Sequence, residues 1–69
     1  MLFTVQVRLG EASFVARMSE MREWLDRHRY EPDLFQHRTE PDGAVLRVDF
    51  KVESEAFQFA VAFGGSILR

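Results

Sequence analysis

Residues 44–52 read AVLRVDFKV, and apolar and polar side chains alternate along them. Leu46, Val48 and Phe50 take every second position, with charged residues between them. A repeat of two is typical of a β-strand that turns one face to a core and the other to solvent. This segment therefore predicts a half-buried strand, around which the rest of the chain must build a sheet and a covering layer.

Two other segments predict strands that could pair with it. Residues 2–9 read LFTVQVRL and alternate in the same way, which predicts a first strand. Residues 34–40 read LFQHRTE and predict a second strand, joined to the 44–52 strand by a Pro-Asp-Gly turn.

Two helices are predicted between and after these strands. Residues 14–29 place their apolar side chains along one stripe at helical spacing, with Ser13 as the expected N-cap. Residues 54–63 form a second, Ala- and Phe-rich segment that we expect Ser54 to cap. Two glycines, residues 64–65, follow it, as is common where a helix ends.

The Pro-Asp-Gly turn at residues 41–43 allows two pairings of the strands that it joins. A two-residue loop pairs Phe35 with Phe50 and turns Phe35 toward the core. A three-residue loop with a bulge at the glycine turns Gln36 and Arg38 inward instead. Because burying Gln36 and Arg38 without partners is costly, we expect the pairing that places Phe35 inside.

The last residues, 66–69, can form a short fourth strand beside the first. The order of elements is then β-α-β-β-α-β, which is that of a ferredoxin-like α+β sandwich. Both helices would cover one face of an antiparallel sheet with the strand order 4-1-3-2, and the handedness of crossover connections favours this arrangement over its mirror image. We expect residues 1–69 to form a single domain of this class.

Composition narrows the classes of function. Nine basic and eleven acidic side chains give a net charge of −2, whereas dedicated nucleic-acid-binding domains are usually basic. The chain has no cysteine, which excludes disulfides and thiolate chemistry. No apolar run is long enough to cross a bilayer and the N-terminus does not resemble a signal peptide, so we expect a cytoplasmic protein without membrane contact.

The 54–63 helix carries apolar side chains around most of its circumference. One sheet covers a helix on one side only, and a 69-residue chain without disulfides is near the lower size limit for folding alone. We therefore expect Phe59 and Phe63, with Trp24 on the flank of the first helix, to form an interface with a second copy or another protein. The alternative is that Phe59 and Phe63 pack against Trp24 and the last strand, with Trp24 at the edge of the core.

The solvent face of the predicted sheet carries a surplus of basic side chains. They come from three strands: Arg8, Arg38, Arg47 and Lys51. Sheets that bind single-stranded RNA present aromatic rings on their two central strands, and this face has none. We expect a face that is solvated or buried in a dimer, with nucleic-acid binding as the alternative function.

No residue pattern predicts an enzyme, a cofactor or a metal site. His28 and His37 are the only histidines and lack the spacing of zinc ligands, and no serine lies in a nucleophile elbow. The loop after the first strand, residues 9–12, has neither the Cys-x-x-Cys of ferredoxin-like metal chaperones nor the glycine-rich arginine loop of acylphosphatases. We expect a non-enzymatic module for protein interaction or assembly, acting as a homodimer.

Overall fold

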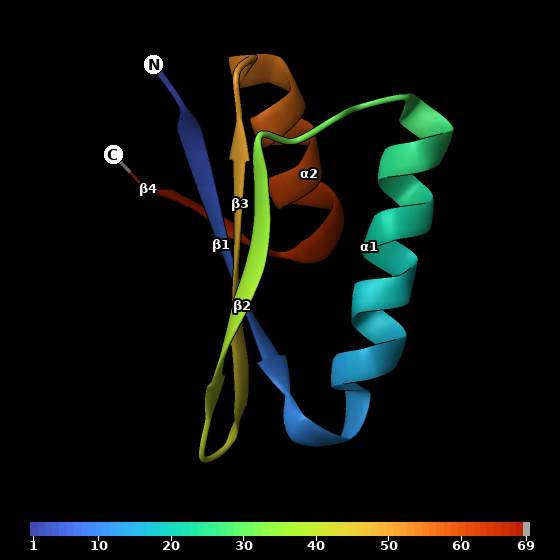
Figure 1. The fold of residues 1–69 in the computed structure, drawn as a ribbon, viewed down its shortest axis with the longest axis vertical. Helices are drawn as coiled ribbons and strands as arrows, with labels where there is room; N and C mark the ends of the chain where they lie inside the picture. Colours follow the sequence, from blue (N-terminus) through green and yellow to red (C-terminus); the bar gives the residue numbers. More distant parts are fainter. Residues whose placement is uncertain (69) are drawn as a thin grey trace.

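The computed structural model describes residues 1–68, and its elements follow one another in the order β-α-β-β-α-β (Figure 1). The strands are β1 (Phe3–Gly10), β2 (Leu34–Glu40), β3 (Gly43–Phe50) and β4 (Ser66–Leu68). The helices are a short 3-10 helix η1 (Glu11–Ser13), α1 (Phe14–His28) and α2 (Glu53–Phe63).

Within the described residues, the four strands form one antiparallel sheet in the order β2-β3-β1-β4. Both α-helices lie on the same face of this sheet (Figure 1). The ferredoxin-like α+β fold that the sequence predicts is thus confirmed, including the short fourth strand beside β1. Over residues 1–68, no helix is both long enough and apolar enough to cross a membrane.

The two central strands form the floor of the core. Val5 of β1 pairs with Val48 of β3, and both side chains are fully buried beneath the helices. Burial of each large apolar side chain contributes about 1.5–3 kcal/mol to folding. The buried apolar residues form one cluster: Val5, Val7, Leu9, Met21, Leu25, Leu46, Val48, Phe50, Ala56, Phe59, Ala60 and Phe63.

The β2–β3 hairpin confirms that Phe35 faces the core but changes its partner. Phe35 pairs with Val48 rather than Phe50, because the two-residue loop consists of residues 41–42 rather than 42–43. A shift of two residues keeps every side chain on its own face of the sheet. The polar side chains predicted to lie on the solvent face of β2 therefore remain there.

Both α-helices end with a residue in the left-handed conformation. Arg29 has a φ of 58° after α1, and Gly64 has a φ of 68° after α2. The backbone amides of Tyr30 and Gly65 then donate hydrogen bonds to carbonyls in the last turn of the preceding helix. These bonds satisfy carbonyl groups that a helix end leaves without partners.

One of the two predicted helix caps is wrong. α2 begins at Glu53 with Val52 at the N-cap position, so Ser54 lies inside the first turn. Glu53 and Glu55 favour this earlier start, because carboxylates are stabilised by the positive end of the helix dipole. Ser13 does occupy the N-cap position of α1, although its side chain makes no capping hydrogen bond.

Gly65 brings the chain from α2 into close contact with β1. A Cβ atom at Gly65 would lie 2.8 Å from Val7 Cγ2 and 3.0 Å from the backbone oxygen of Gln6. Real side chains do not approach so closely, so any larger residue has to push β4 away from β1. The glycine therefore allows the fourth strand to join the sheet without displacing β1.

We expect Gly65→Ala to lower the free energy of unfolding by about 1–3 kcal/mol, the usual effect of overpacking. Gly10→Ala is the matched control, because Gly10 has a φ of −72° and the nearest atom to an added Cβ is 3.9 Å away. The free energy of unfolding of Gly10→Ala should differ from that of the wild type by less than about 1 kcal/mol. Urea unfolding of both variants measures the difference, and equal stabilities would contradict the close approach.

Candidate interaction surface

An aromatic cluster joins the two α-helices at the position where the sequence predicts an interface. Trp24 of α1 meets Phe59 and Phe63 of α2 edge-on, with ring centroids 5.7 and 5.8 Å apart. Phe59 also contacts Phe50 of β3, with centroids 5.5 Å apart. Such aromatic pairs contribute about 0.5–1.5 kcal/mol each beyond the burial of their area.

The prediction that Phe59 and Phe63 reach the surface is wrong. Phe59 is 0% exposed and Phe63 is 9% exposed within the single chain. The alternative packing, against a half-buried Trp24 at the edge of the core, is the one that the structure shows. The physical reason is that this rotation of α2 places its two largest inward-facing rings over the core, where they remove the most apolar surface from water.

The opposite side of α2 leaves a different apolar pair in solvent. Phe57 is 59% exposed and Val61 is 68% exposed, and their i,i+4 spacing places them on one face of the helix. The prediction that one sheet cannot cover every ring of this helix is therefore confirmed, but the uncovered ring is that of Phe57. The sequence carries only a small difference between the two faces, because the Phe59–Phe63 face has two aromatic rings and the Phe57–Val61 face has one. This difference alone does not decide which face is buried.

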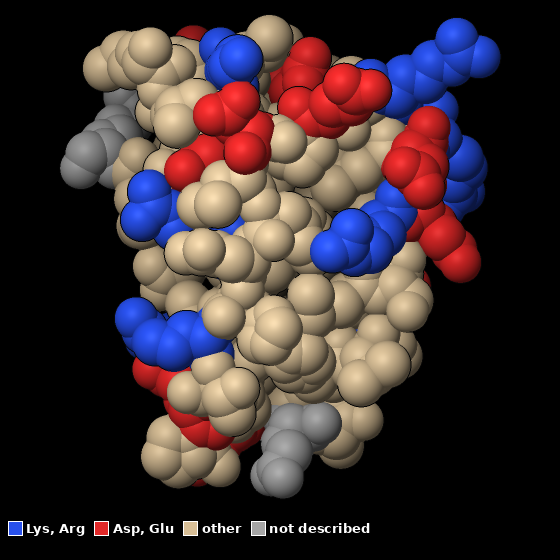
Figure 2. Space-filling view, viewed as in Figure 1, with Lys and Arg blue, Asp and Glu red and all other residues tan. Residues whose placement is uncertain are grey.

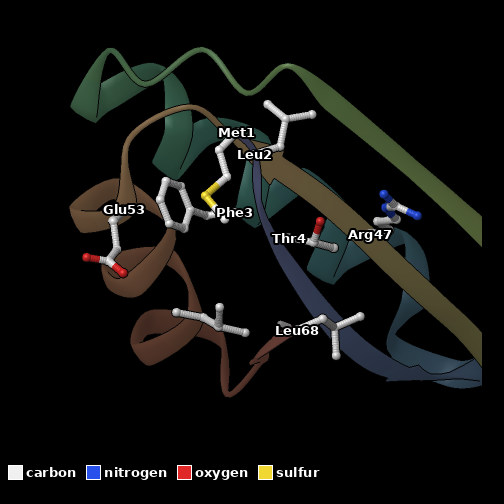
Figure 3. A pocket seen from close by; sticks show the side chains of 8 residues that line it. Met1, Leu2, Phe3, Thr4, Arg47, Glu53 and Leu68 are labelled. Atoms are coloured by element: carbon white, nitrogen blue, oxygen red, sulfur yellow. The ribbon is translucent and has the colours of Figure 1, made fainter.

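This exposed pair is continuous with the β4 edge of the sheet. Phe57 and Ile67 line a hollow beside the start of α2. Ile67 also lines a second hollow of about 460 Å³, with Leu2, Phe3 and Leu68 (Figure 3). We call the resulting apolar band the flank surface, and define it by five residues: Leu2, Phe57, Val61, Ile67 and Leu68. Glu53 lines both hollows and Arg47 lines the second, so charged side chains border the flank surface. Exposed apolar surface with a polar rim is typical of interaction sites.

The solvent face of the sheet is charged, but its charges neutralise one another. Arg8 and Arg38 both reach the carboxylate of Glu40, at 3.6 and 3.2 Å. Val45 pairs with Arg8 on one side and Arg38 on the other, and it is buried on this otherwise polar face. Basic and acidic side chains are also interspersed on the face of the molecule that Figure 2 shows, with no separate basic patch.

Lys51 does not belong to the sheet face, in contrast to the prediction. β3 ends at Phe50, and Lys51 lies in the following bend with its Nζ atom 3.3 Å from the carboxylate of Asp33. The four basic residues predicted to form the basic face therefore each lie within 3.6 Å of a carboxylate oxygen. This pairing reduces the positive potential that a nucleic acid would require.

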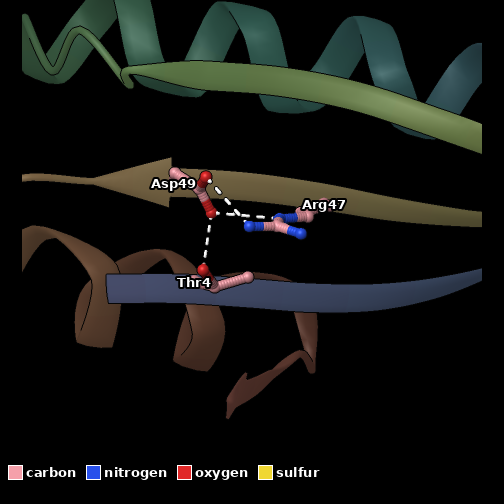
Figure 4. A network of polar contacts seen from close by, with 3 residues as sticks. All are labelled: Thr4, Arg47 and Asp49. Atoms are coloured by element: carbon pink, nitrogen blue, oxygen red, sulfur yellow. Dashed lines mark hydrogen bonds and ion pairs between the residues drawn. The ribbon is translucent and has the colours of Figure 1, made fainter. Parts of the chain in front are cut away.

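One carboxylate on this face is buried. Asp49 is 3% exposed and accepts a hydrogen bond of 2.6 Å from Thr4 Oγ1, together with bonds of 3.3 and 3.4 Å from Arg47 (Figure 4). Burial alone raises the pKa of Asp49, but the hydrogen bonds from Thr4 and Arg47 and the charge of Arg47 outweigh it and lower the pKa below its ordinary value of 3.8. Asp49 thus links β1 to β3 as a fully bonded structural carboxylate.

The two histidines lie in separate aromatic contacts. The ring of His28 stacks on Trp24 at 4.1 Å, and its Nδ1 atom lies 2.8 Å from the Trp24 carbonyl oxygen. His37 on β2 meets Phe14 edge-on at 4.9 Å. Among the side chains that the structure describes, no group of three His, Asp or Glu residues converges in a way that could hold a metal ion.

Comparisons of the chain with protein-family models, with curated proteins and with solved structures gave no match. The ferredoxin-like assignment therefore rests on the order of the elements and the topology of the sheet. This architecture hosts many unrelated functions, so the function has to be argued from the surface itself.

The two faces of α2 should respond differently to truncation. Phe59→Ala removes a fully buried ring and should lower the free energy of unfolding by about 3–5 kcal/mol. Phe57→Ala, two residues away on the exposed face, should change it by less than about 0.5 kcal/mol. Urea denaturation measures both values. Since a domain of this length has roughly 3–10 kcal/mol of stability, complete unfolding of Phe59→Ala also agrees with the prediction, whereas equal effects would contradict it.

The buried carboxylate gives a second prediction. Thr4→Val keeps the shape of the side chain but removes the donor to Asp49, so the free energy of unfolding at neutral pH should fall by about 1–3 kcal/mol. Thr39→Val on the exposed strand β2 is the matched control and should have little effect. An unchanged stability of Thr4→Val would show that the hydroxyl does not support the carboxylate.

The same variant should alter the acid sensitivity of the domain. Because the folded-state pKa of Asp49 lies below 3.8, the unfolded chain binds the proton first as the pH falls. The stabilisation from Asp49 is therefore complete above about pH 4 and is lost as the pH falls through the folded-state pKa. Thr4→Val removes a hydrogen bond to the Asp49 carboxylate, so the folded-state pKa of Asp49 should rise. The variant should therefore lose less stability than the wild type as the pH falls. Urea unfolding of both proteins over a series of acidic pH values measures how steeply the free energy of unfolding falls with pH in each.

Proposed function

We propose that this domain is a non-enzymatic module for protein interaction or assembly, and that it binds its partner through the flank surface. The observation that carries the proposal is the exposure of Phe57 and Val61 on one face of α2, where Phe57 lines a hollow together with Ile67 of β4. A large ring and a β-branched side chain held on a rigid helix provide contact area at a small cost in side-chain entropy.

The core of the domain also supports a binding role. Phe59 and Phe63 are covered by the chain's own atoms, so the flank surface is additional to the contacts that hold the fold together. A surface that the fold does not use, on elements that the core holds in place, is suited to recognition.

We propose a homodimer as the working state and the cytosol as its location. The small size of the domain makes additional burial between subunits favourable. A chain without cysteine is suited to a reducing compartment. The nucleic-acid alternative has weaker support, because Arg8, Arg38 and Arg47 of the sheet face are paired with carboxylates.

The test compares the exposed apolar pair on α2 with a single exposed apolar residue on α1. The double variant Phe57→Glu/Val61→Glu places charges on the flank surface, while Val15→Glu places one on an exposed apolar position of α1. Sedimentation measures self-association, and capture on immobilised domain measures other protein partners. We expect the wild type and Val15→Glu to bind and the double variant to lose binding. Loss in Val15→Glu alone, or in neither variant, would contradict the proposal.

The alternative function, nucleic-acid binding, is tested with the same protein variants. A fluorescent pool of short RNA or DNA at low salt should bind weakly or not at all, because the sheet face has little free positive charge. Salt-dependent binding would replace the proposal with nucleic-acid recognition if Arg8→Glu and Arg47→Glu each abolish it. The double variant Phe57→Glu/Val61→Glu should then still bind.

A further inference from the structure

The two edges of the sheet differ in their chemistry. The outer strand β2 exposes Gln36, His37, Arg38 and Thr39, and a proline follows it at position 41. Charged side chains and proline are the features that protect a strand edge from pairing with another chain. At the opposite edge, β4 consists of Ser66, Ile67 and Leu68 and has no charged residue.

β4, whose described residues carry no charge, lies within the flank surface. Ile67 of β4 lines both hollows, one with Phe57 of α2 and the other with Leu2 and Leu68. The edge strand β4 and the exposed ring of Phe57 therefore lie close to each other. A partner that pairs with β4 can cover the exposed side of α2 at the same time.

We propose that the occupant of the flank surface is a second copy of this chain, and that the two copies pair β4 with β4 in antiparallel orientation about a twofold axis at Ile67. The two four-stranded sheets then become one sheet of eight strands. The twofold axis is perpendicular to the sheet, so the helices of both copies lie on one face and each α2 meets its counterpart in antiparallel orientation. This inference rests on the proposed function and specifies its partner and geometry.

The sequence of β4 is self-complementary in this arrangement. Ile67 lies opposite its counterpart, and Leu68 lies opposite Ser66 of the other copy, so no like charges oppose each other across the new strand pair. Glu53, at the start of α2, lines both hollows together with Ile67, so one carboxylate of each copy lies at the border of the contact. Among the described residues, no charged side chain of one β4 strand opposes the other β4 strand.

The area required for a stable dimer explains why both the strand and the helix take part. A standard interface buries about 800 Å² on each partner, whereas the whole chain exposes 4794 Å². A strand of three residues cannot supply that area alone, so the contact must extend over Phe57 and Val61. Pairing of β4 with β2 of another copy would instead bury the charged edge and produce an open-ended filament.

The experiment uses the absence of cysteine from the chain. Ser66→Cys and Leu68→Cys each introduce a single thiol at an exposed position of β4. When the two variants are mixed and gently oxidised, the proposed register places the two different thiols opposite each other. The covalent product should therefore be mainly the mixed dimer, resolved by mass. A mixture of Ser19→Cys, on the exposed face of α1, with Leu68→Cys is the control and should give little mixed dimer.

The outcomes separate this inference from the proposed function. A predominant mixed dimer supports β4 pairing. If the wild type sediments as a dimer but the β4 variants give no preferred mixed product, the edge pairing is wrong and the flank surface joins the copies in another way. If the wild type remains a species of 8.1 kDa at every concentration reached, the second copy is wrong. The homodimer proposed as the working state is then wrong as well, and the proposed interaction role stands only if Phe57→Glu/Val61→Glu loses a different protein partner.

Discussion

The packing of Trp24 against Phe59 and Phe63 is the contact on which the helical layer depends. A domain of this length buries only about 60% of the surface that its unfolded chain exposes, so the few large side chains of the helices must close the core. Arg17 extends this contact, because its guanidinium lies over the ring of Phe63 at 5.4 Å. The rotation of α2 that seats these two rings also decides which of its side chains remain outside.

Core packing and the candidate interaction surface are therefore two results of one helix rotation. With Phe59 and Phe63 buried, the helix must leave Phe57 and Val61 exposed, because they lie on its other side. The end of the same helix then positions β4. Gly65 approaches β1 more closely than any other residue type could, and this approach places Ile67 beside Phe57. The flank surface is thus built from the helix, the glycine turn and the edge strand together.

The solvent face of the sheet has a different character, because its charged groups are satisfied within the chain. Glu40 lies between Arg8 and Arg38, and the stems of such long side chains can cover apolar surface, as the burial of Val45 indicates. Asp49 is held by Thr4 and Arg47. Because these charges already have partners, binding a charged ligand instead would contribute little binding free energy. The contrast with the unpartnered flank surface is the reason for placing recognition at the flank.

The sequence by itself determined the order of the elements, the topology of the sheet and the face on which Phe35 lies. These features follow from local periods of two or 3.6 residues and from turn residues, and a period of two keeps Phe35 inside even though its partner moved from Phe50 to Val48. Only the tertiary structure decided which face of α2 is buried and that Lys51 leaves the sheet for Asp33. Both faces of α2 are apolar enough to enter a core. The choice between them depends on the shape of the space under Trp24 and over Phe50, which arises only when distant segments of the chain have come together.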